Sequence, residues 1–223
     1  MKRLLSLLVL MVLMVSCSPK EEGVLGLLND KVTEITSFHQ DIEMKILAPN
    51  MPVQRIVING DFIVNNKEFK SYYNHVEQAD TETEVYYDGE KVHLFRGNNE
   101  QVLDPQEQDY ASTYFALVEN IKETYEYLEE ETLDDGSVKL SFTGQNDELF
   151  QKARVPFNID LGNITSENTY VTLNYTINPE GYLTTFNQLF EGSLEGKVVN
   201  FFIESDFMDF NNVDPIEFPE SMN

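Results

Sequence analysis

The stretch TYVTLNYTINPEGYLTTFNQLF, residues 169–190, consists of two runs of alternating apolar and polar residues on either side of Asn178-Pro179-Glu180-Gly181. Alternation with a period of two is typical of a strand with one buried face, and Asn, Pro and Gly favour a tight turn. The stretch therefore predicts two antiparallel strands, and it indicates that the last third of the chain is mainly sheet.

The same alternation recurs along most of the chain. In FHQDIEMKI, residues 38–46, apolar Phe38, Ile42, Met44 and Ile46 share one face of the predicted strand. Short segments rich in Asn, Asp, Gly and Pro interrupt the later runs and predict turns between them. The runs predict strands at residues 38–46, 53–64, 68–76, 127–133, 138–142 and 197–207, with a further pair inside 84–95.

Two segments instead have the spacing of three and four residues that is typical of an amphipathic helix. The first contains Leu25, Leu28, Val32 and Ile35. The second is predicted to begin at Asp104-Pro105, a capping residue followed by proline at the first helical position, and to end near Tyr125. A shorter helical segment of one or two turns is predicted at residues 146–153.

These elements predict an α+β fold in which about ten antiparallel strands form one strongly curved sheet. A sheet of this size tends to curl, and we expect a half-barrel with the two main helices on its concave side. No repeat or low-complexity linker divides the chain, so residues 24–223 are predicted to form a single domain.

The N-terminus has the features of a secretory signal peptide, predicted at residues 1–16. A basic start at Lys2-Arg3 precedes an apolar run from Leu4 to Val15, which is shorter than the ~18–20 residues of a membrane-spanning helix. The segment MVSC, residues 14–17, resembles the lipobox of bacterial lipoproteins. That resemblance implies a diacylglyceryl group on Cys17, a short tether at residues 17–23, and a protein held at the outer face of the cell membrane. The alternative is a signal peptide in which the cysteine is incidental.

The chain is strongly acidic. Fifteen lysine and arginine residues stand against thirty-nine aspartate and glutamate residues, which gives a net charge of −24. Such a surface repels nucleic-acid phosphates and anionic lipid headgroups, so the composition argues against nucleic-acid partners.

Three short motifs lie in an order that resembles a family of Gram-positive bacterial lipoproteins. They are Ser37-Phe38 at the start of a strand, YYDG at Tyr86–Gly89, and a terminal pattern formed by Phe207, Phe210, Asn211 and Val213. The family is distantly similar to the Lol-pathway carriers and to the mycobacterial glycolipid-carrying lipoproteins. This resemblance implies a half-barrel over an apolar cavity and a lipid-like ligand, but it assigns no ligand-binding residue.

Recognisable catalytic motifs are missing from the sequence. His39, His75 and His93 all fall in predicted strands without the spacing of metal ligands, and no nucleophile elbow, phosphate loop or dinucleotide fingerprint is present. The sequence therefore predicts a protein that is not an enzyme and that uses no metal or cofactor. A cell-surface glycosidase with two facing carboxylates is the competing enzyme hypothesis.

Aromatic residues crowd the middle of the chain. The simplest interpretation is that they pack in the core and in cross-strand pairs. The functional interpretation is that some line a cavity for an apolar or amphiphilic ligand. The candidate ligand-binding residues are Tyr73, Tyr86, Tyr110, Tyr114, Phe115 and Val118. The alternative function is a scaffold module with a packed interior, which contacts an envelope protein through its outer surface.

Overall fold

The computed structural model describes residues 23–105, 113–158, 169–194 and 197–222. Within these ranges, eleven strands pair into one antiparallel sheet. The strands are β1 (Ser37–Leu47), β2 (Gln54–Asn65), β3 (Glu68–Gln78), β4 (Thr81–Tyr87), β5 (Val92–Arg96), β6 (Asn99–Leu103), β7 (Glu129–Thr132), β8 (Val138–Gly144), β9 (Tyr170–Ile177), β10 (Leu183–Leu194) and β11 (Lys197–Met208).

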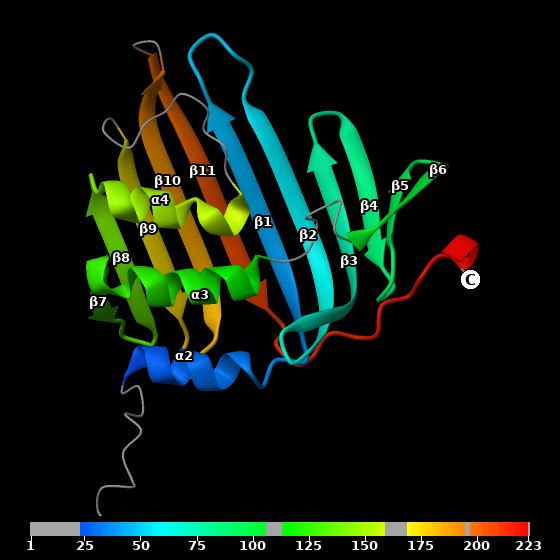
Figure 1. The fold of residues 1–223 in the computed structure, drawn as a ribbon, viewed down its shortest axis with the longest axis horizontal. Coiled ribbons are helices and arrows are strands. Elements are labelled where there is room, and N and C mark those ends of the chain that lie inside the picture. Colours follow the sequence, from blue (N-terminus) through cyan, green and yellow to red (C-terminus); the bar gives the residue numbers. More distant parts are fainter. Residues whose placement is uncertain (1–22, 106–112, 159–168, 195–196, 223) are drawn as a thin grey trace, which may run out of the picture.

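The order of strands in the sheet is β6-β5-β4-β3-β2-β1-β11-β10-β9-β8-β7, so the first and last strands meet at the centre (Figure 1). The chain steps outward from β1 to β6 at one edge and then continues at β7 on the opposite edge. It returns strand by strand to β11. Because β1 pairs antiparallel with both β2 and β11, it is the central strand of the sheet.

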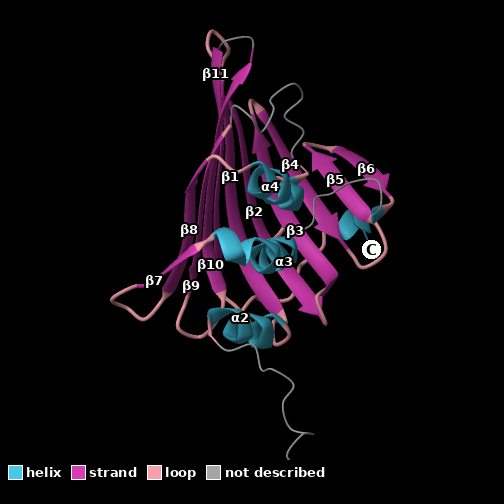
Figure 2. Cartoon of the chain, turned by 60° about the vertical axis from the view of Figure 1, so that its left-hand side comes forward, coloured by secondary structure: helices cyan, strands magenta, loops and turns pink. Residues whose placement is uncertain are grey.

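Three helices, α2 (Val24–Val32), α3 (Tyr114–Thr124) and α4 (Asp147–Ala153), lie on one face of the sheet, which bends around them (Figure 2). This arrangement confirms the predicted α+β fold with a curved, open antiparallel sheet. The strand that the sequence does not reveal is β6, whose residues are almost all exposed and show no apolar face. Helices α3 and α4 cover β8 to β11, and no described helix lies over the ends of β2 and β3 that are remote from α2 (Figure 1).

Helix α3 begins at Tyr114, so the predicted start at Asp104-Pro105 is wrong. The carboxylate of Asp104, which directly follows β6, binds the ammonium group of Lys91. The predicted end near Tyr125 is confirmed, because Thr124 is the last α-helical residue. Residues 106–112 lie outside the described residues.

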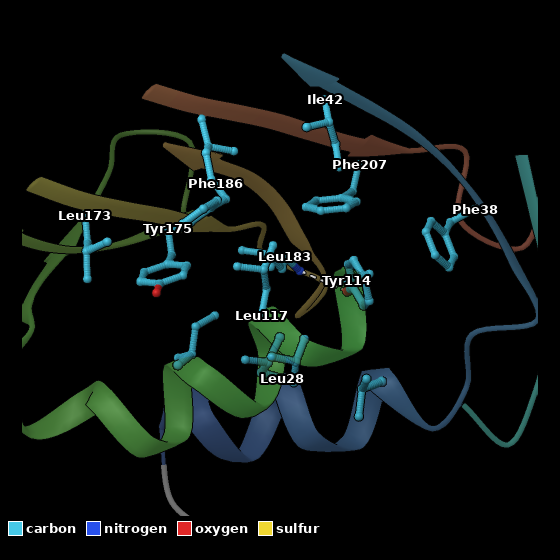
Figure 3. Close-up of a cluster of buried hydrophobic side chains, with 14 of the residues drawn as sticks. Leu28, Phe38, Ile42, Tyr114, Leu117, Leu173, Tyr175, Leu183, Phe186 and Phe207 are labelled. Atoms are coloured by element: carbon cyan, nitrogen blue, oxygen red, sulfur yellow. Dashed lines mark hydrogen bonds between the residues drawn. The ribbon is translucent and has the colours of Figure 1, made fainter. Parts of the chain in front are cut away.

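The core lies between the helices and the sheet (Figure 3). Leu28 of α2 and Leu117 of α3 are fully buried, and they face the strands that carry Tyr175 and Phe186. The hydroxyl of Tyr175 donates a hydrogen bond of 3.0 Å to Asn120 Oδ1, and Asn120 Nδ2 donates one of 2.9 Å to the carbonyl of Lys152. This buried polar connection fixes α3 against β9 and α4.

Two of the three family-like motifs meet in space. The backbone N–H of Asn211 donates to the carbonyl of Ser37 at 2.8 Å, and Asn211 Oδ1 accepts from the backbone N–H of Thr36 at 2.6 Å. The rings of Phe207 and Phe210 lie 6.4 and 6.3 Å from the ring of Phe38. The first strand and the segment after the last strand are therefore held together beside the central pairing of β1 with β11. All described helices and strands lie within residues 24–222, so a soluble form that begins at Ser18 retains all of them.

Candidate functional site

The part of the concave face without a helix over it contains a groove of about 490 Å³. The groove lies at the ends of β1, β2, β3 and β11 that are remote from α2. It is lined by Met44, Ile46, Pro52, Val53, Gln54, Arg55, Ile56, Glu77, Gln78, Ala79 and Phe201.

The strand register explains why its floor is apolar. Met44 lies opposite Ile56 on β2, and Ile46 lies opposite Phe201 on β11, so alternate residues of three strands bring their side chains to the same face. Ile46 and Ile56 are half-buried and take no part in the packed core. At the mouth, the loop between β1 and β2 exposes 58% of Met51 and 57% of Val53. The groove thus presents apolar surface that the described fold leaves uncovered.

Arg55 is the one lysine or arginine among the groove residues, and the register places its side chain on the convex face, where carboxylates pair with it. Its Nε binds Glu43, and its Nη1 lies 3.9 Å from Glu77. Hydrogen bonds from Lys45 and Arg55 hold the pKa of Glu43 below its usual value. The groove therefore offers no cation without a carboxylate partner, and it does not favour an anionic headgroup.

Three of the six candidate ligand-binding residues lie on α3. Tyr114 and Val118 are 0% exposed in the core, and the Tyr114 hydroxyl accepts a 3.3 Å hydrogen bond from the backbone N–H of Leu183. Burial raises the pKa of Tyr114. Phe115 is half-buried, with its ring 5.5 Å from that of Tyr114. None of these three side chains lines the groove.

Tyr73 and Tyr86 lie on the convex face, with ring centroids 4.9 Å apart. Together with Asp61 they occupy one cross-strand row over β2, β3 and β4, where they line a polar hollow of about 360 Å³ beside residues 209–217. Burial and the charge of Glu84 raise the pKa of Tyr73 to about 12. Tyr110 lies outside the described residues. The structure therefore does not bring the candidate residues together into one site.

Sequence reasoning did not single out the residues that line the groove, among them Ile46, Ile56 and Phe201. Their alternation marks them as inward-facing, in the same way as the core residues of the same strands. What separates them from the core is the position of α3 and α4. The sequence pattern does not give that position.

The convex face carries pairs of like charges on β1 and β11. Asp41 lies directly opposite Asp206, and Glu43 lies directly opposite Glu204. Like charges at facing positions destabilise a sheet. Burial and the neighbouring charge of Asp41 raise the pKa of Asp206 above its usual value.

Replacing Asp206 with asparagine should therefore stabilise the protein at neutral pH. A raised folded-state pKa means that the folded protein is favoured while Asp206 is protonated, and that this stability is lost as pH rises through the folded pKa. We expect Asp206→Asn to raise the free energy of unfolding by about 0.5 kcal/mol at pH 7, with the gain disappearing below the ordinary aspartate pKa of about 3.9. Urea unfolding at several pH values measures the difference.

Glu191→Gln is the matched control, because Glu191 faces the uncharged Asn200 and Tyr170. An equal gain in both variants would show that total charge, and not the Asp41–Asp206 pair, sets the effect.

No group of three or more histidine, cysteine, aspartate or glutamate side chains in the described ranges could hold a metal ion. His39 Nδ1 lies 2.7 Å from Asp61, and its Nε2 lies 3.2 Å from Asp41. Although burial favours the neutral ring, these two carboxylates raise the pKa of His39. The described helices include none that is long and apolar enough to cross a membrane.

Comparison with known proteins bears on the fold. No protein-family model and no curated protein matches the sequence. The crystal structure of LprF from Mycobacterium bovis aligns with 91% of this chain and 97% of that chain, at a TM-score of 0.50 and 11% identity. The chain shares the fold of LprF. The resemblance to mycobacterial lipoproteins predicted from sequence motifs is thus confirmed as a distant structural likeness.

A LolA superfamily protein from Nitrosomonas europaea also aligns, over 88% of this chain and 94% of that one, with 12% identity. Its TM-score of 0.28 is too low to carry an argument. The likeness to LprF shows the architecture of the sheet and helices, and the groove described above is a feature of this chain.

Proposed function

We propose that this protein is a membrane-anchored bacterial lipoprotein that binds an apolar or amphiphilic, lipid-like molecule in the groove at the open end of its concave face. The observation that carries the proposal is the groove itself, an uncovered apolar surface formed by the inward-facing residues of β1, β2 and β11.

The size and chemistry of the groove support a small amphiphile. Its volume of about 490 Å³ lies within the range of about 300–1,000 Å³ that is usual for small-molecule sites. Arg55 is paired with Glu43 and Glu77, and the chain carries a net charge of −24, so the ligand is best an uncharged one. The resemblance to lipid-carrying lipoproteins points to the same class of ligand.

Cys17 would hold the protein at the outer face of the cell membrane, close to the membrane lipids that the groove would bind. The proposal includes no chemical step, metal or cofactor, so the protein is a binding protein and not an enzyme. Cys17 and the predicted signal peptide lie outside the described residues.

The alternative, a scaffold for an envelope protein, is favoured by one observation. The like-charged residues Asp41 and Asp206 lie directly opposite each other on the convex face, and the charge of Asp41 raises the pKa of Asp206. A basic partner would relieve this repulsion. The two functions use opposite faces of the sheet, and they can therefore be tested separately.

The test is lipid binding by the soluble form that begins at Ser18. Native mass spectrometry of the protein purified from its host should show bound lipid, and the stripped protein should take up a fluorescent diacylglycerol. The double variant Ile46→Gln, Ile56→Gln places two amides on the groove floor and should lower this uptake at least tenfold, since burying an unpaired amide costs about 1–3 kcal/mol.

Leu47→Gln with Val57→Gln is the matched control, since these residues are next to the first pair in the chain but point to the convex face. The control should bind as the natural protein does. A wild-type protein that carries no lipid and takes none up would refute the proposal, as would equal uptake by both double variants.

A further inference from the structure

On the concave face of β10 and β11, two of the described side chains are polar, buried and without a hydrogen-bond partner. Gln188 on β10 is 3% exposed, and neither its amide nitrogen nor its amide oxygen is bonded. Ser205 on β11 is 2% exposed, and its hydroxyl oxygen is also without a partner. A buried polar atom without a partner costs about 1–3 kcal/mol, so an arrangement with three such atoms needs an explanation.

Both side chains belong to the concave face. Phe186, the next residue on the same face of β10 as Gln188, lies directly opposite Ser205, so Gln188 and Ser205 are diagonal neighbours. Leu173 and Ile203 flank Gln188 on the adjacent strands. The three polar atoms thus form a small patch within apolar surroundings.

This patch lies just behind the inner wall of the groove. Phe201, a groove residue, pairs with Phe190, which lies two residues after Gln188 on the same face of β10. On the other side, the groove residue Met44 pairs with Ile203. The ring of Phe150 on α4 lies 5.1 Å from that of Phe190, and both rings are buried beside the groove residue Phe201 without lining the groove themselves.

The chemistry of the patch defines what would satisfy it. An amide supplies donors and an acceptor, and a hydroxyl supplies one donor and accepts as well. An ester carbonyl or a hydroxyl group can pair with such a set, whereas a charged group would lose its hydration among the apolar neighbours without gaining a counter-charge. A hydrocarbon without any polar group would leave the patch unpaired.

We infer that Gln188 and Ser205 bind the uncharged ester or hydroxyl group of an acylglycerol-type amphiphile whose chain occupies the groove. This inference rests on the proposed function and deepens it, because it assigns the ligand class and the residues that select it. To reach Gln188, the ligand separates Phe150 from Phe190, so that α4 moves outward at this end of the groove.

The experiment compares uptake of three probes by the soluble form: a diacylglycerol, a free fatty acid at neutral pH, and an alkane of matched chain length. The natural protein should prefer the diacylglycerol. Gln188→Met keeps the length of the side chain and removes its hydrogen-bonding groups. It should weaken diacylglycerol binding about 5- to 20-fold and leave alkane uptake unchanged.

A thermal-melting readout separates binding from structure. Gln188→Met should melt at the same temperature as the natural protein or higher, because it removes two unpaired buried atoms. Gln101→Met, on the exposed strand β6 and outside the groove, is the control variant and should retain the natural preference. Ser205→Ala should lower diacylglycerol binding less than Gln188→Met does.

Equal diacylglycerol affinity in Gln188→Met and the natural protein would overturn the inference. Loss of alkane uptake together with a lower melting temperature would also overturn it, since Gln188 would then support the fold. Both results leave the proposed function intact. A natural protein that binds none of the probes would contradict both the inference and the proposed function.

Discussion

Replacing Phe38 with alanine is expected to lower the free energy of unfolding by about 3–5 kcal/mol, the usual cost of removing a fully buried aromatic ring. Phe38 is 0% exposed and is the second residue of β1, the central strand of the sheet. Its ring centroid lies 5.0 Å from that of Phe62 on β2 and 5.2 Å from that of Tyr114 on α3. One side chain therefore joins two central strands, α3 and the segment after β11.

The loss should exceed that of an ordinary core residue because Phe38 packs against several large rings that cannot collapse into the vacated space. Chemical denaturation of the soluble form measures the effect. Phe202→Ala is the control, because Phe202 lies on the convex face and is half-buried, and it should cost about 1 kcal/mol. Equal losses in the two variants would contradict the central place assigned to Phe38.

Replacing Cys17 with alanine is expected to abolish lipid attachment. A single acyl chain gives only marginal membrane binding, whereas two chains anchor a protein stably, since each buried CH₂ contributes about 0.8 kcal/mol. A diacylglyceryl group on Cys17 would supply both chains. The chain has no second cysteine that could take its place.

Metabolic labelling with a radioactive fatty acid, followed by purification, is the direct measurement. Labelling of Cys17→Ala should fall to background, and the mass of the protein should show that cleavage before residue 17 no longer occurs. Ser18→Ala, a change one residue further on, should be labelled and cleaved as the natural protein is. Unchanged labelling and processing of Cys17→Ala would show that Cys17 is not the anchor.

The alternation of apolar residues was enough to predict most of the sheet, because a strand with one buried face has a distinctive period. The strand β6 was missed because residues 99–103 bury almost nothing and show no apolar face, although the strand pairs with β5 along its whole length. The start of α3 was misplaced because Asp104-Pro105 has the chemistry of a helix start, whereas α3 begins at Tyr114 and the carboxylate of Asp104 pairs with Lys91.

The candidate site was harder to predict than the fold. Neighbouring residues in a strand point to opposite faces, so Tyr72 and Tyr73 could not both line a concave cavity. The register shows that Tyr72 and Tyr87 face the core side, while Tyr73 and Tyr86 face outward. The period-two rule contains this information. The aromatic-rich composition of the region concealed it, and the groove itself depends on where three helices stop.

The position of α2 relative to the groove has a consequence for an anchored protein. The tether enters α2, which lies at the end of the sheet where β1 begins, and the groove lies where β1 ends (Figure 1). The eleven residues of β1 span about 35 Å, whereas residues 17–23 reach at most about 25 Å. If Cys17 anchors the domain, the tether is therefore too short for the groove mouth to face the bilayer that holds the anchor. With such an anchor, the domain would either lie with its long axis along the membrane or stand with the groove mouth facing away from it.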